Sequence, residues 1–217
     1  MNHQAWHISE FNPERFTAFH GHIKDILEAL GEPINFDSLH GKFRETRHYQ
    51  QHSNYYKEHV IENLLRVTKT IKANPFGEYG LRHWRVIEPK DVGDKAYLVL
   101  KHEKKPLHYT QITEFINQHG FDERTAYKET VHNELIMDER FVLVGRGIYA
   151  LVDWGYKKGL VADIIKEILA ASSEPMDRGK LVEEVLKQRV VRRNTILVGL
   201  ANKHLFRKVG KNKYTLA

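Results

Sequence analysis

The fold of this chain is decided by the stretch Thr130-Val-His-Asn-Glu-Leu-Ile-Met-Asp-Glu-Arg-Phe-Val-Leu-Val-Gly-Arg-Gly-Ile-Tyr-Ala-Leu151, which continues to Trp154. Val131 and Leu135 have the spacing that places two side chains on one face of a helix. Alternating apolar residues then flank a glycine-containing segment: Phe141, Leu143, Tyr149 and Leu151. Alternation around such a segment is typical of two short strands joined by a turn. The stretch therefore predicts one helix followed directly by a β-hairpin.

The same pattern occurs twice more in the chain. The copy from Thr195 to Leu216 aligns without a gap, so that Thr130, Leu135, Phe141, Val144, Gly145, Tyr149 and Leu151 match Thr195, Leu200, Phe206, Val209, Gly210, Tyr214 and Leu216. An earlier copy places Asn63, Leu65, Ile71, Gly77, Tyr79, Leu81 and Trp84 opposite Asn133, Leu135, Phe141, Gly147, Tyr149, Leu151 and Trp154. A fixed register of this kind indicates internal repeats.

The preceding halves of the three repeats also match. A leucine, a proline and an aliphatic residue recur at intervals of six: Leu27, Pro33 and Leu39; Leu100, Pro106 and Ile112; Leu169, Pro175 and Leu181. Proline cannot continue a helix, so it separates a first helix from a second. The second helices are predicted to begin near Phe36, His108 and Asp177, with Thr110 and Asp177 as N-caps. Each repeat then reads as helix, turn, helix, connection, helix and two-stranded wing.

This order predicts a mainly α fold with small β-hairpins, arranged as three tandem winged helix-turn-helix domains. The expected domains are residues 1–88 with an N-terminal extension, residues 89–155, and residues 156–217. Linkers are expected at 86–93 and 155–159, where glycines occur. The extension, residues 1–19, carries several apolar side chains and is expected to pack on the first domain or on a partner: Trp6, Ile8, Phe11, Phe16 and Phe19.

Composition excludes several classes of protein. The 217 residues include no cysteine, so disulfides and thiolate zinc sites are excluded. No apolar run approaches the roughly 20 residues of a membrane span, and the first residues lack the pattern of a signal peptide. We therefore expect a cytoplasmic protein that does not enter a membrane. Its oligomeric state is left open.

The positive charge is concentrated near the C-terminus. The net charge is +6 and the sequence pI is about 9.3. Between residues 178 and 213 only Glu183 and Glu184 oppose the cations Arg178, Lys180, Lys187, Arg189, Arg192, Arg193, Lys203, Arg207, Lys208, Lys211 and Lys213. Such a surplus attracts phosphate backbones. A solvated basic face is the alternative.

The second repeat resembles the HARE-HTH winged-helix family, which includes the N-terminal domain of the bacterial RNA polymerase delta subunit. The resemblance rests on Lys105-Pro-Leu-His-Tyr-Thr-Gln-Ile112, on 130–135 and on 138–154, and in the first repeat on Tyr79-Gly-Leu-Arg-His-Trp84. Tandem units of this kind also resemble the C-terminal region of bacterial sigma-factor-like helix-turn-helix proteins. The resemblance implies a role in transcription, with double-stranded DNA or RNA polymerase as partner. The long acidic tail of the delta subunit is absent here.

In a winged helix, the third helix reads DNA and the wing contacts the backbone. The DNA-binding candidates in the third repeat are therefore Arg192, Arg193, Asn194 and Thr195 on the helix and Arg207, Lys208, Lys211 and Lys213 on the wing. Arginine can pair with guanine and asparagine with adenine, whereas wing lysines neutralise phosphates. The candidates in the second repeat are Lys128, His132 and Arg146, but nearby carboxylates make a protein contact equally plausible there.

No pattern in the sequence indicates catalysis. There is no nucleophile elbow, paired acidic motif or phosphate-binding glycine fingerprint, so we predict a non-enzymatic protein without cofactor. His3, His7, His20 and His22 lack the spacing of a metal site. Asn63 and Asn133, which share a register position, are expected to form inward hydrogen bonds.

Two alternatives to direct DNA binding stay open: a protein-interaction scaffold, and the DNA-specificity region of a larger nucleic-acid enzyme.

Overall fold

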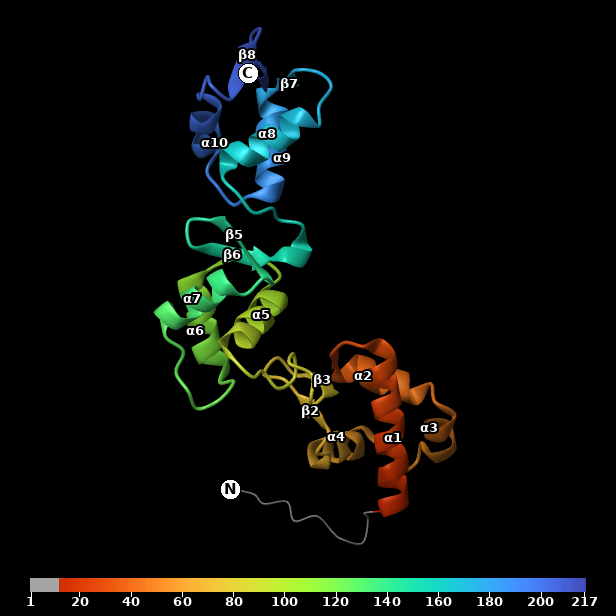
Figure 1. Ribbon diagram of the computed structural model, residues 1–217. Helices are drawn as coiled ribbons and strands as arrows, with labels where there is room; N and C mark the ends of the chain where they lie inside the picture. The colour runs from red at the N-terminus through yellow and green to blue at the C-terminus, as the bar shows by residue number, and fades with distance from the viewer. Residues whose placement is uncertain (1–11) are drawn as a thin grey trace. The chain divides into compact units, whose positions relative to one another are not determined.

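The structure is a computed structural model that describes residues 12–217. Trp6, Ile8, Phe11, His3 and His7 lie outside the described residues. The chain divides into two compact units between Lys90 and Asp91. The first unit holds the first repeat, and the second unit holds the other two (Figure 1). The expectation of a mainly α fold with small β-hairpins is confirmed.

The helices and strands follow one order in every repeat. The first repeat contains α1 (Pro13–Leu30), β1 (Ile34–Asn35), α2 (Phe36–Arg44), α3 (Arg47–His52), α4 (Glu58–Val67), β2 (Ile71–Ala73) and β3 (Glu78–Leu81). The second contains α5 (Val92–Glu103), β4 (Leu107–His108), α6 (Tyr109–His119), α7 (Lys128–Met137), β5 (Phe141–Gly145), β6 (Ile148–Leu151) and the 3-10 helix η2 (Val152–Trp154). The third contains α8 (Val161–Ala170), β7 (Met176–Asp177), α9 (Arg178–Gln188), α10 (Arg193–Leu200), β8 (Phe206–Val209) and β9 (Lys213–Leu216).

Each repeat builds a three-stranded antiparallel sheet, and the three sheets share one register. The hairpins pair Ile71 with Leu81, Phe141 with Leu151, and Phe206 with Leu216. The sequence predicted a two-stranded wing, but each sheet has a third strand. This short strand precedes the second helix and pairs with the strand that carries the repeated tyrosine: Ile34 with Tyr79, Leu107 with Tyr149, and Met176 with Tyr214. The added strand ties the start of the second helix to the hairpin.

The second helices begin where the sequence predicts, but one cap differs. Asp177 caps α9 by accepting a hydrogen bond from the Gly179 N–H at 2.7 Å. Thr110, expected to cap α6, is the second residue of that helix, and the His108 side chain caps it instead. Imidazole can accept from a backbone N–H as a hydroxyl does, so the cap moved to the residue with extended backbone.

The first repeat has the largest aromatic core. Phe19 from α1 is fully buried, and its ring meets the Phe43 ring edge-on at 5.2 Å. In this repeat the connection between the second helix and α4 contains the short helix α3 and the fully buried Tyr56. The Tyr56 hydroxyl donates to the Arg15 carbonyl at 3.0 Å. Phe16 and Phe19 therefore belong to the first helix and its core.

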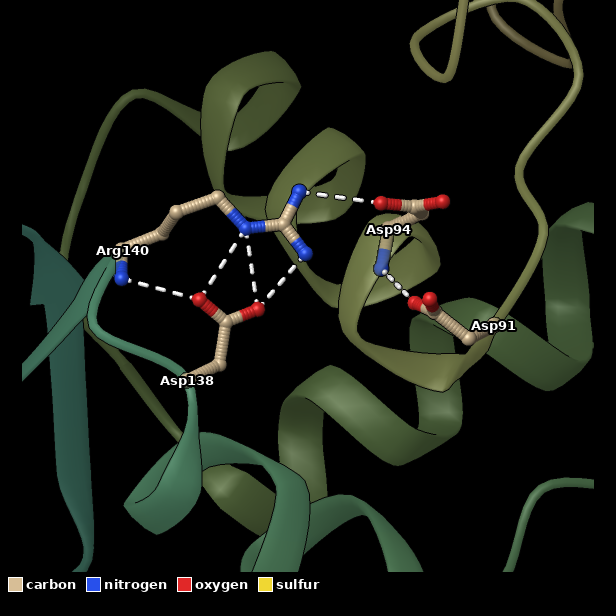
Figure 2. A network of polar contacts seen from close by, with 4 residues as sticks. All are labelled: Asp91, Asp94, Asp138 and Arg140. Atoms are coloured by element: carbon tan, nitrogen blue, oxygen red, sulfur yellow. Dashed lines mark hydrogen bonds and ion pairs between the residues drawn. The ribbon is translucent and has the colours of Figure 1, made fainter.

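The start of α5 is tied to the hairpin of the second repeat by an ion-pair network (Figure 2). Arg140 binds Asp138 through Nη2 at 2.6 Å and the buried Asp94 through Nη1 at 2.9 Å. Asp91 caps α5 by accepting from the Asp94 N–H at 2.8 Å. The expected linker through Gly93 therefore ends earlier, because Gly93 lies within α5.

Within the second unit, the third repeat contacts the hairpin of the second. The Val190 N–H donates to the Val144 carbonyl at 3.0 Å. Arg189 donates through Nη1 to the carbonyls of Leu143 at 2.6 Å and Lys157 at 3.2 Å. A side chain at Gly145 would approach the Val190 carbonyl to 2.5 Å, so glycine is needed for this close contact. None of the helices within residues 12–217 is long and apolar enough to cross a membrane.

Candidate functional site

The third repeat exposes cations on α10 and on the β8–β9 hairpin. Helix α10 turns Ile196 and Leu200 into the core, which leaves the start of the helix facing solvent. In β8, Phe206 is buried and the three residues after it are exposed. All eight candidates predicted for this repeat are exposed: Arg192, Arg193, Asn194, Thr195, Arg207, Lys208, Lys211 and Lys213. The elements therefore present these side chains to solvent, as a binding surface requires.

Helix α10 begins without a side-chain cap. Arg192 occupies the N-cap position with extended backbone, and no side chain accepts from the first turn. Free N–H groups and the helix dipole make such an end attractive to anions. Arg192 and Arg193 add two full charges at the same place. This end of α10 is therefore the most electropositive part of the helix.

The six cations among these candidates have no acidic partner among the described residues. In the basic segment of the third repeat, the cation Lys187 binds Glu184 at 2.7 Å. Unpaired surface cations can exchange water and counterions for a polyanion without first losing an ion pair. The wing cations Arg207, Lys208, Lys211 and Lys213 therefore remain available for a ligand.

One member of the predicted basic surplus is not on the surface. Arg189 is only 7% exposed, and its Nη1 bonds to carbonyls of the second repeat and the following loop. Nothing in the local sequence distinguishes it from Arg192 or Arg193, because its burial depends on contact between two repeats. Arg189 is therefore removed from the candidate polyanion surface.

Apolar side chains share the exposed face of α10. Val198 is 73% exposed and Leu197 is 37% exposed. At the end of α7, Ile136 is 60% exposed and Met137 is 80% exposed. Methyl groups can contact thymine in a major groove, but exposed apolar groups also occur at protein interfaces. Both kinds of contact are chemically compatible with α10.

The second repeat offers a weaker surface. Lys128 and Arg146 are exposed, but the His132 ring stacks on Tyr109 at 4.4 Å and is half buried. His132 therefore packs against Tyr109 of α6, and only part of its ring is accessible to a ligand. Asn133 is exposed, so the inward hydrogen bond expected for it is also wrong.

The hairpin of the second repeat carries buried side chains on both of its faces. Phe141 and Tyr149 pack into the helical core, while Val142 and Val144 form a second buried cluster with Trp154. This packing explains the recurrence of tryptophan after the hairpin. The corresponding Trp84 packs against the core of the first repeat. At the tip of the second hairpin, Arg146 is exposed and is the cation of this hairpin that can reach a polyanion.

Several described histidines of the first repeat have aromatic or hydroxyl neighbours. His20 bonds to the Thr70 hydroxyl at 2.6 Å, and His22 lies beside His48 with ring centroids 4.9 Å apart. Within residues 12–217 no group of three or more histidine and carboxylate side chains is placed to hold a metal ion.

No protein-family model matches the sequence, and no curated protein matches it. The class of the protein is therefore inferred from the repeats and from the exposed basic surface.

Proposed function

We propose that each repeat is a winged helix-turn-helix domain of the HARE-HTH type and that the chain is a non-enzymatic DNA-binding protein acting in transcription. The shared order of three helices and a hairpin supports the domain assignment. The observation that carries the DNA-binding proposal is the set of unpaired, exposed cations on α10 and the β8–β9 hairpin.

The proposed complex places the start of α10 in the major groove. Arg192 and Arg193 lie where base edges or phosphates are met, and Asn194 has the amide that pairs with adenine. The hairpin lysines contact the adjacent backbone, which supplies affinity without reading sequence. Affinity in this arrangement is largely electrostatic.

The direct test is fluorescence anisotropy with a labelled DNA duplex. Arg207, Lys208, Lys211 and Lys213 are replaced together by glutamine, and the matched control replaces four exposed cations of the first unit: Lys42, Arg44, Lys69 and Lys72. We expect at least a tenfold loss of affinity for the hairpin variant and a much smaller change for the control. Equal losses would show that net charge alone attracts DNA, and would remove the assigned surface.

The second candidate function is a contact with RNA polymerase. The exposed Val198 on α10 and the exposed Ile136 and Met137 on α7 favour it, because DNA backbones offer no apolar surface to cover them. Binding of purified RNA polymerase is measured after nuclease treatment, with the native chain and with Val198→Gln. Nuclease-resistant binding that Val198→Gln weakens would support a scaffold over direct DNA binding.

A further inference from the structure

A cavity of about 500 Å³ lies in the second unit, between the second repeat and the segment that leads into the third. Its walls combine α7 and β5 with the end of the linker, the start of α8 and Arg189. Cavities of roughly 300–1,000 Å³ are typical of small-molecule sites. The cavity is separate from the exposed face of α10 and from the proposed hairpin cations.

Arg189 places an uncompensated positive charge at this cavity. Arg189 is only 7% exposed, and the hydrogen bonds of its Nη1 atom go to two neutral carbonyls. The Nε atom is buried without a hydrogen-bond partner among the described residues. Burial lowers the pKa of Arg189, the direction expected when no carboxylate stabilises a cation. A buried charge without a counter-ion is costly, so an anion at this guanidinium is favoured.

The rest of the lining is mainly apolar and partly open to solvent. Ile136, Leu143 and Leu160 are 60%, 45% and 73% exposed, respectively. An apolar ligand group that covers them removes this surface from water. The charged groups beside Arg189 in the lining are Lys158 and Asp163, and Asp163 already accepts from the Leu160 N–H at 2.9 Å. The lining therefore matches an anionic head and an apolar tail.

We propose that this cavity binds a small amphipathic carboxylate. The carboxylate lies at the Arg189 guanidinium, and the alkyl chain lies against Leu143 and Leu160. A charge-assisted hydrogen bond from the guanidinium to the carboxylate offsets the buried charge, which has no counter-ion among the described residues. Because the lining comes from two repeats, the ligand also holds them together and stabilises the second unit. The inference does not depend on DNA binding.

The test uses the full chain and octanoate as the probe, measured by isothermal titration calorimetry. Octylamine and 1-octanol are the matched controls, because they keep the chain and change only the head group. We expect saturable binding of octanoate, with octanol at least tenfold weaker and octylamine not detectable. Absence of saturable octanoate binding, or equal affinities for octanoate and octanol, would overturn the proposal.

Three variants locate the site. Arg189→Gln is expected to weaken octanoate binding at least tenfold, while Lys180→Gln, an exposed cation of the same repeat, leaves it unchanged. Leu160→Trp keeps the guanidinium, changes an exposed position and fills the cavity, so it is expected to abolish binding without unfolding the chain. Native affinity in Leu160→Trp would place octanoate elsewhere and contradict the assignment, even if Arg189→Gln failed to fold.

Discussion

The Val190 N–H and the Val144 carbonyl are joined by a 3.0 Å hydrogen bond that links the third repeat to the hairpin of the second. Val190 lies two residues before Arg192, the N-cap of α10. The contact therefore fixes the backbone that leads directly into the proposed DNA-reading helix. It also covers the hairpin edge that would otherwise expose unpaired backbone groups. In the proposed DNA complex, the second repeat supports the third and contributes few contacts of its own.

Gly145→Ala is predicted to weaken the contact between the second repeat's hairpin and the third repeat. The new methyl group would lie 2.5 Å from the Val190 carbonyl, so one strand must move. We expect a loss of about 1–3 kcal/mol in the free energy of unfolding of the second unit, the usual cost of an overpacked contact. Hydrogen exchange at the Val190 amide should also accelerate. The control is Gly199→Ala, where the nearest side-chain atom is 3.5 Å away and no loss is expected. Equal stability of both variants contradicts the contact.

Asp94→Ala is predicted to destabilise the second unit through the network of Figure 2. The Asp94 side chain is 1% exposed and binds Arg140 Nη1 at 2.9 Å. Its removal leaves a partly buried guanidinium donor without this acceptor, a change that costs about 1–3 kcal/mol. Chemical denaturation measures the effect, with the exposed Asp153→Ala as control. A loss no larger than that of the control would refute a stabilising role.

Much of the fold follows from the sequence because the repeated residues form the core. Leu135, Phe141 and Tyr149 recur in fixed register, and each is buried. The two-residue strands, such as Leu107–His108, could not be predicted from the sequence, because they are too short to show alternating hydrophobicity. The burial of Arg189 escapes prediction for another reason, since it arises from contact between repeats rather than from local pattern. The exposed candidates of the third repeat were predictable, because charge density and helix position both lie in the local sequence.

The first unit is predicted to lose stability in mild acid. Burial lowers the pKa of His48 below 6.5, and the neighbouring His22, His52 and Arg15 add positive charge that acts in the same direction. Well above pH 6.5, His48 is neutral in both the folded and the unfolded chain, so its protonation takes nothing from the free energy of unfolding. As the pH falls below this value, the unfolded chain takes up the proton first, so stability is lost down to the folded pKa.

Thermal unfolding between pH 7.5 and pH 5, values chosen to span about one to two units around the histidine pKa, measures this dependence. Substitution of His22 by Asn removes one neighbouring charge and should reduce the slope. The comparison with Tyr56 is informative, because burial raises the pKa of Tyr56 to about 12 and the hydroxyl does not titrate in this range. The same slope in native and His22→Asn chains would contradict a contribution from the His22 charge, and a slope of zero in the native chain would contradict the role of His48.

The salt dependence of affinity is the most direct measurement of whether the exposed cations of the third repeat bind duplex DNA. Arg192, Arg193 and the four hairpin cations can together contact several phosphates. Each neutralised phosphate contributes about −0.9 to the slope of log K against log salt concentration, so we predict a slope between about −3 and −5. A slope near zero, or no measurable binding at low salt, would contradict the account.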